Sequence, residues 1–301
     1  MCIGMFPIFK PKGMVYAYGV SLPGTYHIKN DIVCQDSHEI LLLNKQAGIT
    51  AVADGLGSAA FSDVASNIAA STAVAFCRQR LVSVKKIKEV PEMLKAAFLA
   101  AHRAVEKEAA DKNHDLAQYD TTLSLAFLLQ DTLFYGHSGD SGIIALTTSG
   151  RYEAVTQQQR DEQGRVFPLF FTDKWVFGQY KEKVSAVLLA TDGILETFFP
   201  LYIRKEPVNI HVSLARFFMD NQELSVKTRT RAEVEADITA FLTAIPDEQV
   251  NDDKTVAVMI NTAIKSNRQP DAYYTEPDWE ALKKKHDEAW RRAAYPGMFK
   301  D

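Results

Sequence analysis

Short apolar runs recur along the chain, and they mark the strands that the sequence predicts. Most of them lack a clean alternation of apolar and polar residues, which indicates strands buried on both faces. The predicted strands are 39–44, 49–53, 121–129, 132–139, 142–148, 151–156, 185–191 and 255–261. Two gaps between them, Gln130-Asp131 and Ser149-Gly150, are short enough for hairpin loops. The strands on either side of each gap should therefore pair antiparallel.

Other segments have the periodicity of helices, with apolar residues recurring at spacings of three and four. The predicted helices are 59–80, 91–110, about 211–224 and about 229–244. Ser58 or Ser62 is a candidate N-cap of the first helix, and Pro91 suits the first turn of the second. Hairpins interspersed with helix pairs predict an α+β fold in which antiparallel sheets are covered by helices.

One long segment between predicted strands, residues 156–184, has no strong period. It carries six aromatic residues among charged ones. Two interpretations stay open: a loop that packs its own aromatic side chains, or a flap beside a site.

The C-terminal part of the chain is rich in charged residues and has a helical stretch near 278–293. Trp279, Leu282 and His286 fall on one face of that stretch. This helix either packs on the rest of the protein or offers a surface to a partner. The sequence is accordingly divided into a main domain, 1–265, and a charged C-terminal extension, 266–301.

Composition and charge narrow the class of protein. Apolar residues make up 47% and charged residues 24%, as in soluble globular proteins. The net charge of −4 indicates no nucleic-acid partner and no anionic membrane. The three cysteines, Cys2, Cys34 and Cys77, have no metal-ligand spacing, and an odd number fits a reducing compartment.

The start of the chain and its apolar runs bear on its location. No apolar run approaches the ~18 residues of a membrane span. In residues 1–13 the apolar part is too short for a secretory signal, and the lysines follow it instead of preceding it. The expectation is a soluble, cytoplasmic protein.

Acidic residues stand in polar turns beside the apolar runs at five places. These turns are 34–36, 54–58, 139–142, 191–193 and 251–255. A single Asp-Gly pair is more often a turn than a ligand. Strand ends on the same side of a sheet converge, however, and carboxylates gathered there repel one another unless a cation lies between them. Five such turns in one chain therefore predict a cation site.

The ligand chemistry of these turns favours hard cations. Oxygen ligands without His or Cys are preferred by Mg²⁺ and Mn²⁺. Two such ions that share a carboxylate and a bridging water lower the pKa of that water and clamp the oxygens of a phosphoryl displacement. The four charges of Asp36, Asp54, Asp192 and Asp252 would be matched by two divalent ions.

The order and spacing of these motifs resemble the metal-dependent serine/threonine protein phosphatases of type 2C, and in particular their bacterial branch. The matching motifs, between about residues 19 and 262, are CQDS, VADGLGSAAFSD, DTTLSLAF, GHSGDSG, LLATDGILE and NDDKTVAV. The resemblance implies a β-sandwich flanked on both faces by antiparallel helix pairs. It also implies hydrolysis of phosphoserine and phosphothreonine on proteins, by attack of a hydroxide that bridges two metal ions. Two alternatives remain: a non-catalytic phosphopeptide-binding regulatory module, and a phosphatase of a small phosphorylated metabolite.

The resemblance also implies roles for single residues, with Asp54 and Asp192 central to catalysis. Asp54 would bridge both metals. The remaining ligands would be Asp36 and the carbonyl of Gly55 for the second metal, Asp192 and Asp252 for the first, and Asp140 and Glu196 beside a weaker third site. Gly55 after the buried strand lets its carbonyl turn toward the ion.

Several positions depart from the pattern of the family. Leu56 stands where many relatives have a His as general acid, so the leaving oxygen would take its proton from water or another donor. The phosphate-binding Arg before the first acid is missing, and His27 or Lys29 is the candidate to replace it. Asp120 stands in place of a Gly, and Asp253 in place of an Asn.

Overall fold

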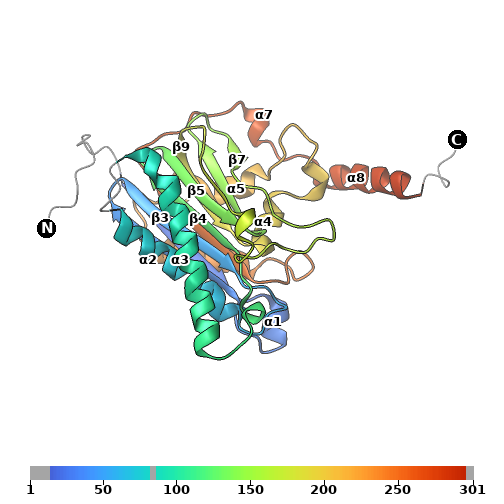
Figure 1. The fold of residues 1–301 in the computed structure, drawn as a ribbon. Helices are drawn as coiled ribbons and strands as arrows, with labels where there is room; N and C mark the ends of the chain where they lie inside the picture. The colour runs from blue at the N-terminus through green and yellow to red at the C-terminus, as the bar shows by residue number, and fades with distance from the viewer. Residues whose placement is uncertain (1–13, 82–85, 296–301) are drawn as a thin grey trace.

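The computed structural model describes residues 14–81 and 86–295, and it shows two antiparallel sheets packed face to face (Figure 1). The first sheet has the strand order β1-β10-β9-β6-β7. Its strands are β1 (Val15–Leu22), β10 (Lys254–Asn261), β9 (Val184–Ala190), β6 (Gly142–Thr147) and β7 (Tyr152–Ala154). The second sheet has the order β2-β3-β4-β5-β8. Its strands are β2 (Asp36–Asn44), β3 (Ala47–Asp54), β4 (Leu123–Leu129), β5 (Thr132–Ser138) and β8 (Val176–Gln179).

The space between the two sheets is filled by apolar side chains from both inner faces. Val52 and Leu128 of the second sheet meet Leu189 and Met259 of the first, and all four are fully buried. Burial of apolar surface contributes ~25 cal/mol for each Å² removed from water, so this layer holds the two sheets together.

Helices cover the outer face of each sheet. On the second sheet lie α2 (Ser62–Arg80) and α3 (Val90–Asp111), side by side in Figure 1. On the first sheet lie α4 (Asp192–Phe198), α5 (Val212–Met219) and α6 (Arg231–Thr243). The shorter elements are α1 (Thr25–Lys29), α7 (Asp271–Tyr274) and the 3-10 turns η1 (Ile87–Glu89), η2 (Leu116–Tyr119), η3 (Thr172–Lys174) and η4 (Leu201–Ile203). The predicted α+β sandwich with helices on both faces is confirmed.

Both predicted hairpins are present. Gln130-Asp131 joins β4 to β5, and Ser149-Gly150 joins β6 to β7, each pair antiparallel. Gly150 has a φ of +93°, and a Cβ there would lie 1.9 Å from the carbonyl oxygen of Asn267. Only glycine fits this turn, because the C-terminal extension crosses directly over it.

Several elements escaped prediction. The strand β1 is buried at most of its positions, but Gly and Ser interrupt its apolar run, and so the sequence pattern did not reveal it. The helix α4 was missed because its seven residues are too few to show a period. The strand β8 lies inside the segment 156–184, where the pattern indicated no regular structure, and it pairs with β5 at the sheet edge.

The predicted cap of α2 is wrong. The residue before the helix is Phe61, and no side chain caps the N-terminus. Ser62 begins the helix instead, and its hydroxyl is buried without a hydrogen-bond partner among the described residues. The prediction for Pro91 is confirmed, since it lies in the first turn of α3.

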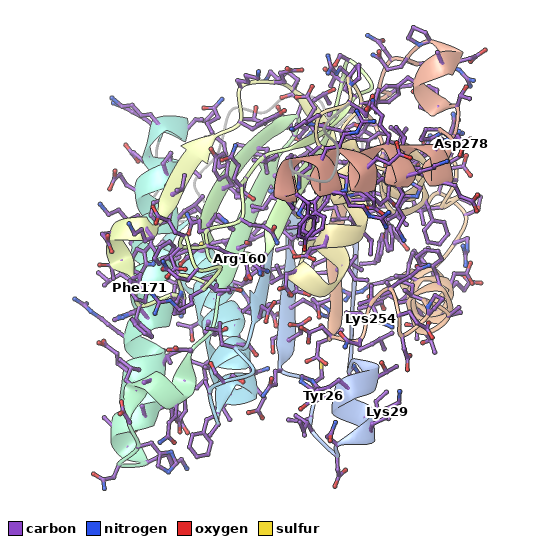
Figure 2. The ribbon with its side chains drawn as sticks, turned by 90° about the vertical axis from the view of Figure 1, so that its right-hand side faces the viewer. Tyr26, Lys29, Arg160, Phe171, Lys254 and Asp278 are labelled. Carbon is purple, nitrogen blue, oxygen red and sulfur yellow. The ribbon has the colours of Figure 1, made fainter. Side chains whose placement is uncertain are left out.

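The aromatic residues of segment 156–184 divide into two groups. Trp175 and Phe177 pack edge-on against Phe98 of α3, so this half of the segment is part of the fold. Phe170 stacks on Phe171, which is exposed, and both lie in the loop before η3. In Figure 2, Phe171 lies at the edge of the molecule and Arg160 nearer its middle.

The C-terminal extension is fastened to the main domain at its start. The backbone N–H of Asn267 donates to the carbonyl oxygen of Thr148 (2.8 Å), and that of Tyr152 donates to the hydroxyl of Tyr273 (2.9 Å). Both contacts are made to the β6–β7 hairpin. The predicted boundary at 265/266 stays a prediction, and these bonds tie the two sides of it together.

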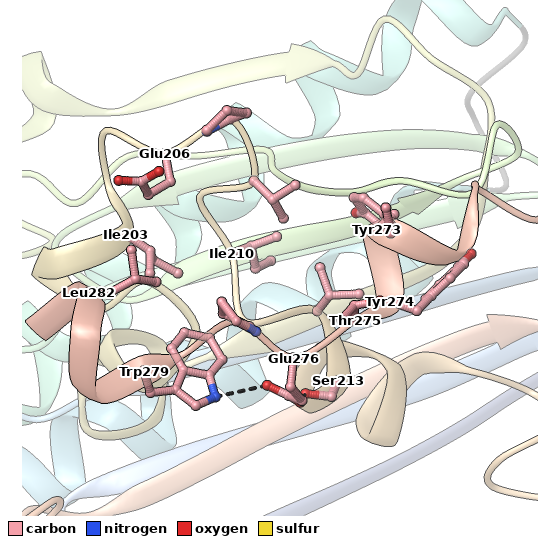
Figure 3. A pocket seen from close by; sticks show the side chains of 15 residues that line it. Ile203, Glu206, Ile210, Ser213, Tyr273, Tyr274, Thr275, Glu276, Trp279 and Leu282 are labelled. Carbon is pink, nitrogen blue, oxygen red and sulfur yellow. Dashed lines mark hydrogen bonds between the residues drawn. The ribbon is translucent and has the colours of Figure 1, made fainter.

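The last helix, α8 (Trp279–Ala294), is anchored only by its first turns. The ring of Trp279 packs at a tilt against that of His211, with ring centroids 4.5 Å apart. Trp279 and Leu282 also line a cavity of about 270 Å³ (Figure 3). The helix then extends away from the sandwich, and the side chain of Trp290 is 59% exposed (Figure 1). The first half of this helix therefore packs on the rest of the protein, and a partner surface on its second half stays a prediction.

The structure bears on the predictions about membrane spans and cysteines, but only for the residues that it describes. None of the described helices is both long and apolar enough to cross a membrane. Cys34 and Cys77 are free thiols. The prediction about a secretory signal, and Cys2, fall in residues 1–13, outside the described residues.

Candidate metal centre

Five acidic residues meet at one end of the sandwich. Asp36 is the first residue of β2 and Asp54 the last of β3, and the two are directly opposite in the antiparallel register. Asp140 precedes β6, Asp192 follows β9, and Asp252 precedes β10, which places all three at the corresponding end of the first sheet. Strand order and register thus bring together turns that are up to 216 positions apart.

Three of these carboxylates form a compact cluster. Carboxylate oxygens of Asp54, Asp140 and Asp192 lie within 4.8 Å of one another. Asp140 is buried, while Asp54 and Asp192 are half-buried at the rim. Three carboxylates at such distances are a suitable oxygen donor set for a divalent cation.

The cluster holds its acids in an environment that opposes their charge. Burial raises the pKa of Asp54 well above its ordinary value, and the charges of Asp36 and Asp192 raise it further. Burial, followed by the charge of Asp192, raises the pKa of Asp140 to about 7. The pKa of Asp192 is also raised, by burial first and by the charge of Asp252 second. A bound cation would relieve this repulsion and favour the ionised forms.

Asp36 links the two sheets at this end. Its carboxylate accepts a hydrogen bond from the hydroxyl of Thr191 (2.7 Å), which immediately precedes Asp192. Burial is the main cause of its raised pKa, and the neighbouring acid Asp253 adds to it. This bond fixes the position of Asp36 relative to the turn that carries Asp192.

The backbone around Gly55 allows no side chain. A Cβ at Gly55 would lie 2.6 Å from the carbonyl oxygen of Ser62 and 2.7 Å from that of Gln35. The hydroxyl of Thr121 and the N–H of Thr122 both donate to the carbonyl oxygen of Asp54, at 3.0 and 2.8 Å. The end of β3 is therefore held closely between α2 and β4, which sets the direction of the Asp54 side chain.

Arg160, which the sequence did not single out, is a cationic residue that contacts the cluster. One of its terminal nitrogens, Nη2, lies 2.8 Å from Asp140, 2.9 Å from Asp192 and 3.4 Å from Glu196. Glu196 is one helical turn beyond Asp192 on α4. Nothing in the local sequence of segment 156–184 distinguishes this arginine from others, because its partners lie at other strand ends.

Asp253 adds a negative charge beside Asp36 and also has a structural role. Its buried carboxylate accepts hydrogen bonds from the N–H of Gly24 (2.7 Å) and of Gln35 (2.6 Å), and it lies 2.7 Å from Nδ1 of His27. His27, Asp252 and Asp253 also offer ligand atoms within 4.8 Å of one another. Asp253 thus ties the turn that carries Asp252 to the start of α1.

The two candidate phosphate-binding residues lie in different surroundings. His27 is buried against Asp253, next to Asp252. The ammonium group of Lys29 is exposed and lies 2.7 Å from Asp247 (Figure 2). Of the two residues, His27 is therefore the one that contacts the turn of Asp252 and Asp253, whereas Lys29 pairs with an acid elsewhere.

Asp120 lies beside the position of the missing general acid. The N–H of Leu56 donates to the carbonyl oxygen of Asp120 (3.0 Å). Burial raises the pKa of the Asp120 carboxyl to about 6, and its buried Oδ1 has no hydrogen-bond partner among the described residues.

The family model of protein phosphatase 2C matches residues 23–243, which is more than half of the 301 residues. The chain belongs to the protein phosphatase 2C family. The resemblance seen in the motifs is thereby confirmed, and divalent metal ions are the cofactors that phosphatases of this family use. No curated protein sequence matches the chain.

Solved structures with the same fold come from bacterial phosphatases. The serine/threonine phosphatase Stp1 from Staphylococcus aureus is 14% identical with a TM-score of 0.55, over 85% of this chain and 98% of that one. The S. agalactiae serine/threonine phosphatase is 13% identical with a TM-score of 0.55, over 82% and 99%. PppA, a key regulatory component of T6SS in Pseudomonas aeruginosa, is 16% identical with a TM-score of 0.52, over 82% and 98%. At these identities the likeness concerns the fold of the 2C phosphatases alone.

Proposed function

We propose that this protein is a metal-dependent phosphatase that hydrolyses phosphoserine and phosphothreonine on proteins. The observation that carries the proposal is the cluster of Asp54, Asp140 and Asp192, whose carboxylate oxygens lie within 4.8 Å of one another at one end of the sandwich. The family model and the fold of bacterial serine/threonine phosphatases support it. The free thiols of Cys34 and Cys77 suit the cytoplasm, where we place the protein.

In this proposal each acid has a distinct role toward two ions, Mg²⁺ or Mn²⁺. Asp54 would be a ligand of both ions, Asp36 and the Gly55 carbonyl would hold one of them, and Asp192 and Asp252 would hold the other. When bound, two such ions supply a water of lowered pKa and neutralise the phosphate oxygens of the substrate. The oxygen-only donor set and the raised pKa of Asp54 suit these hard cations.

The chain's own residues orient this site. Thr191 holds Asp36 through its hydroxyl, and Asp253 holds the turn of Asp252 through the N–H groups of Gly24 and Gln35. Such bonds keep the ligands in place before an ion or a substrate arrives, which lowers the cost of binding. The contact of His27 or Lys29 with the substrate phosphate stays a prediction, which the KM values of His27→Ala and Lys29→Ala test.

The test is hydrolysis of an aryl phosphate and of a phosphothreonine peptide, with Mn²⁺, with Mg²⁺ and with excess chelator. We expect turnover of both substrates with either metal, none with chelator, and a loss of most activity in Asp54→Asn. The control variant is Glu162→Gln, which removes an exposed charge from the segment of Arg160 and should act like the wild type. Equal activity in chelator would contradict the proposal.

The same assay separates the alternatives. Peptide binding without hydrolysis under every metal condition would identify a regulatory phosphopeptide-binding module. Hydrolysis of the aryl phosphate without the peptide would direct the search to a small phosphorylated metabolite.

A further inference from the structure

Arg160 occupies the position between three acidic residues where a shared cation would lie. A single nitrogen, Nη2, is within 2.8–3.4 Å of oxygens from Asp140, Asp192 and Glu196. A divalent ion such as Mg²⁺ binds carboxylate oxygens at ~2.1 Å. The ion and the guanidinium cannot occupy this space together.

The two residues before Arg160 are hydrogen-bonded to the turn that carries Asp140. The N–H of Gln159 donates to the carbonyl oxygen of Gly139 (2.8 Å), and the side chain of Gln159 accepts from the N–H of Gly139 (3.0 Å). The side-chain amide of Gln158 donates to the carbonyl oxygen of Asp140 (3.0 Å). Residues 158 and 159 thus bind the turn that carries Asp140 itself, so Arg160 and Asp140 are held as one unit.

The charges of the site lead to the same arrangement. The guanidinium of Arg160 places a positive charge 2.8–3.4 Å from the oxygens of Asp140, Asp192 and Glu196. A divalent ion entering between the same three oxygens would be repelled by that charge at short range, and this repulsion would be absent if Arg160 were removed.

We propose that Arg160 is the built-in third cation of this site, so that the chain binds two divalent ions and excludes a third from Asp140 and Glu196. This inference rests on the proposed function, because it assumes the two ions at Asp54. It replaces the weaker third-metal site that the sequence predicted beside Asp140 and Glu196. Arg160 is here a positioning residue, which holds the Asp192 carboxylate by a charge-assisted hydrogen bond and the Asp140 carboxylate by an ion pair.

The test counts Mn²⁺ ions bound per chain, by the loss of the electron paramagnetic resonance signal of free Mn²⁺ during titration. The wild type should bind two. Arg160→Ala should bind a third Mn²⁺ ion, with a Kd at least tenfold lower than that of any third ion bound by the wild type. Arg160→Lys, which keeps a positive charge, should again bind two.

Two matched variants show where the extra ion binds. Arg165→Ala removes an exposed arginine of the same segment that pairs with Asp161, so it should bind two ions. The double variant Arg160→Ala/Asp140→Asn should lose the third ion.

The outcomes distinguish this inference from the proposed function. Three ions in the wild type, or two in Arg160→Ala with the fold intact by circular dichroism, would overturn the role of Arg160 and leave the two-metal proposal standing. No Mn²⁺ bound by the wild type would overturn both. An extra ion that persists in the double variant would overturn the role of Arg160 alone, because that ion would bind away from Asp140.

Discussion

Replacing Asp54 by Asn should stabilise the protein in chelator and destabilise it in Mn²⁺. Asn keeps nearly the shape of Asp, and the hydrogen bonds with Thr121 and Thr122 involve the backbone of residue 54 and are preserved. What the substitution removes is one negative charge from a cluster with two others within 4.8 Å. Burial and the neighbouring acids both oppose the charge of Asp54, and we expect their removal to outweigh the loss of its side-chain hydrogen bond with Asp192.

The size of the repulsion follows from Coulomb's law. Two fully ionised carboxylates 4.8 Å apart would repel by about 3.5 kcal/mol at an effective dielectric constant of ~20. The raised pKa values of Asp54 and Asp140 keep part of this charge protonated, so the actual repulsion is smaller. The positive charge of Arg160 offsets one of the two pairs that Asp54 makes. Because Asp54 is half-buried, salt and solvent screen the remainder, and we expect Asp54→Asn to raise the free energy of unfolding by roughly 1–2 kcal/mol.

Mn²⁺ should reverse the order of stability. A ligand that binds only the native state stabilises it by about 2.7 kcal/mol when its concentration is 100 times Kd. The variant loses most of this gain because it lacks the carboxylate proposed to contact both ions. The assay is urea unfolding at 25 °C of the wild type, Asp54→Asn and the control Glu162→Gln, each with chelator and with Mn²⁺.

Two results would refute the reasoning. A variant less stable than the wild type in chelator would mean that the Asp54 carboxylate makes a net favourable interaction there. An undiminished stabilisation by Mn²⁺ would mean that Asp54 is no metal ligand.

Four further predictions concern residues around the site and the extension. Asp253→Ala should lower the free energy of unfolding by about 2–3 kcal/mol in chelator, since it leaves the N–H groups of Gly24 and Gln35 unpaired. The loss should be larger in Mn²⁺, because the turn that carries Asp252 is released as well; urea unfolding measures both. Asp120→Asn should stabilise the protein by about 1–2 kcal/mol above pH 6 and by little near pH 4. The pKa of Asp120 is raised to about 6 in the folded protein, so its carboxyl lowers stability only when the pH is high enough to ionise it. Urea unfolding at several pH values tests the sign. Gly55→Ala should cost about 1–3 kcal/mol, since the new methyl group meets backbone oxygens of other segments; a melting temperature equal to that of the wild type would show that the backbone moves aside. Trp279→Ala should lower the melting temperature by a few degrees, about what 1–2 kcal/mol produces, while Trp290→Ala, at a side chain 59% exposed, should leave it unchanged.

The sequence by itself determined most of the strands, their hairpins and the acids at their ends, but not β1 or β8. Apolar runs fix strand length, and a two-residue gap fixes an antiparallel pairing, as at Gln130-Asp131. These are local properties, because burial and turn chemistry act over a few neighbouring residues. The convergence of Asp54, Asp140 and Asp192 followed from placing each acid at a strand end on one side of the fold.

Only the tertiary structure decided how the charges of the site are paired. Arg160 is 20 residues from Asp140 and 32 from Asp192, and His27 is 226 from Asp253. These pairs form because the loop that carries Arg160 and the short helix that carries His27 cross the ends of the two sheets. The path of such a segment depends on every element that it contacts. A sequence pattern records which residues are charged, but which charges meet depends on long-range packing that no local period encodes.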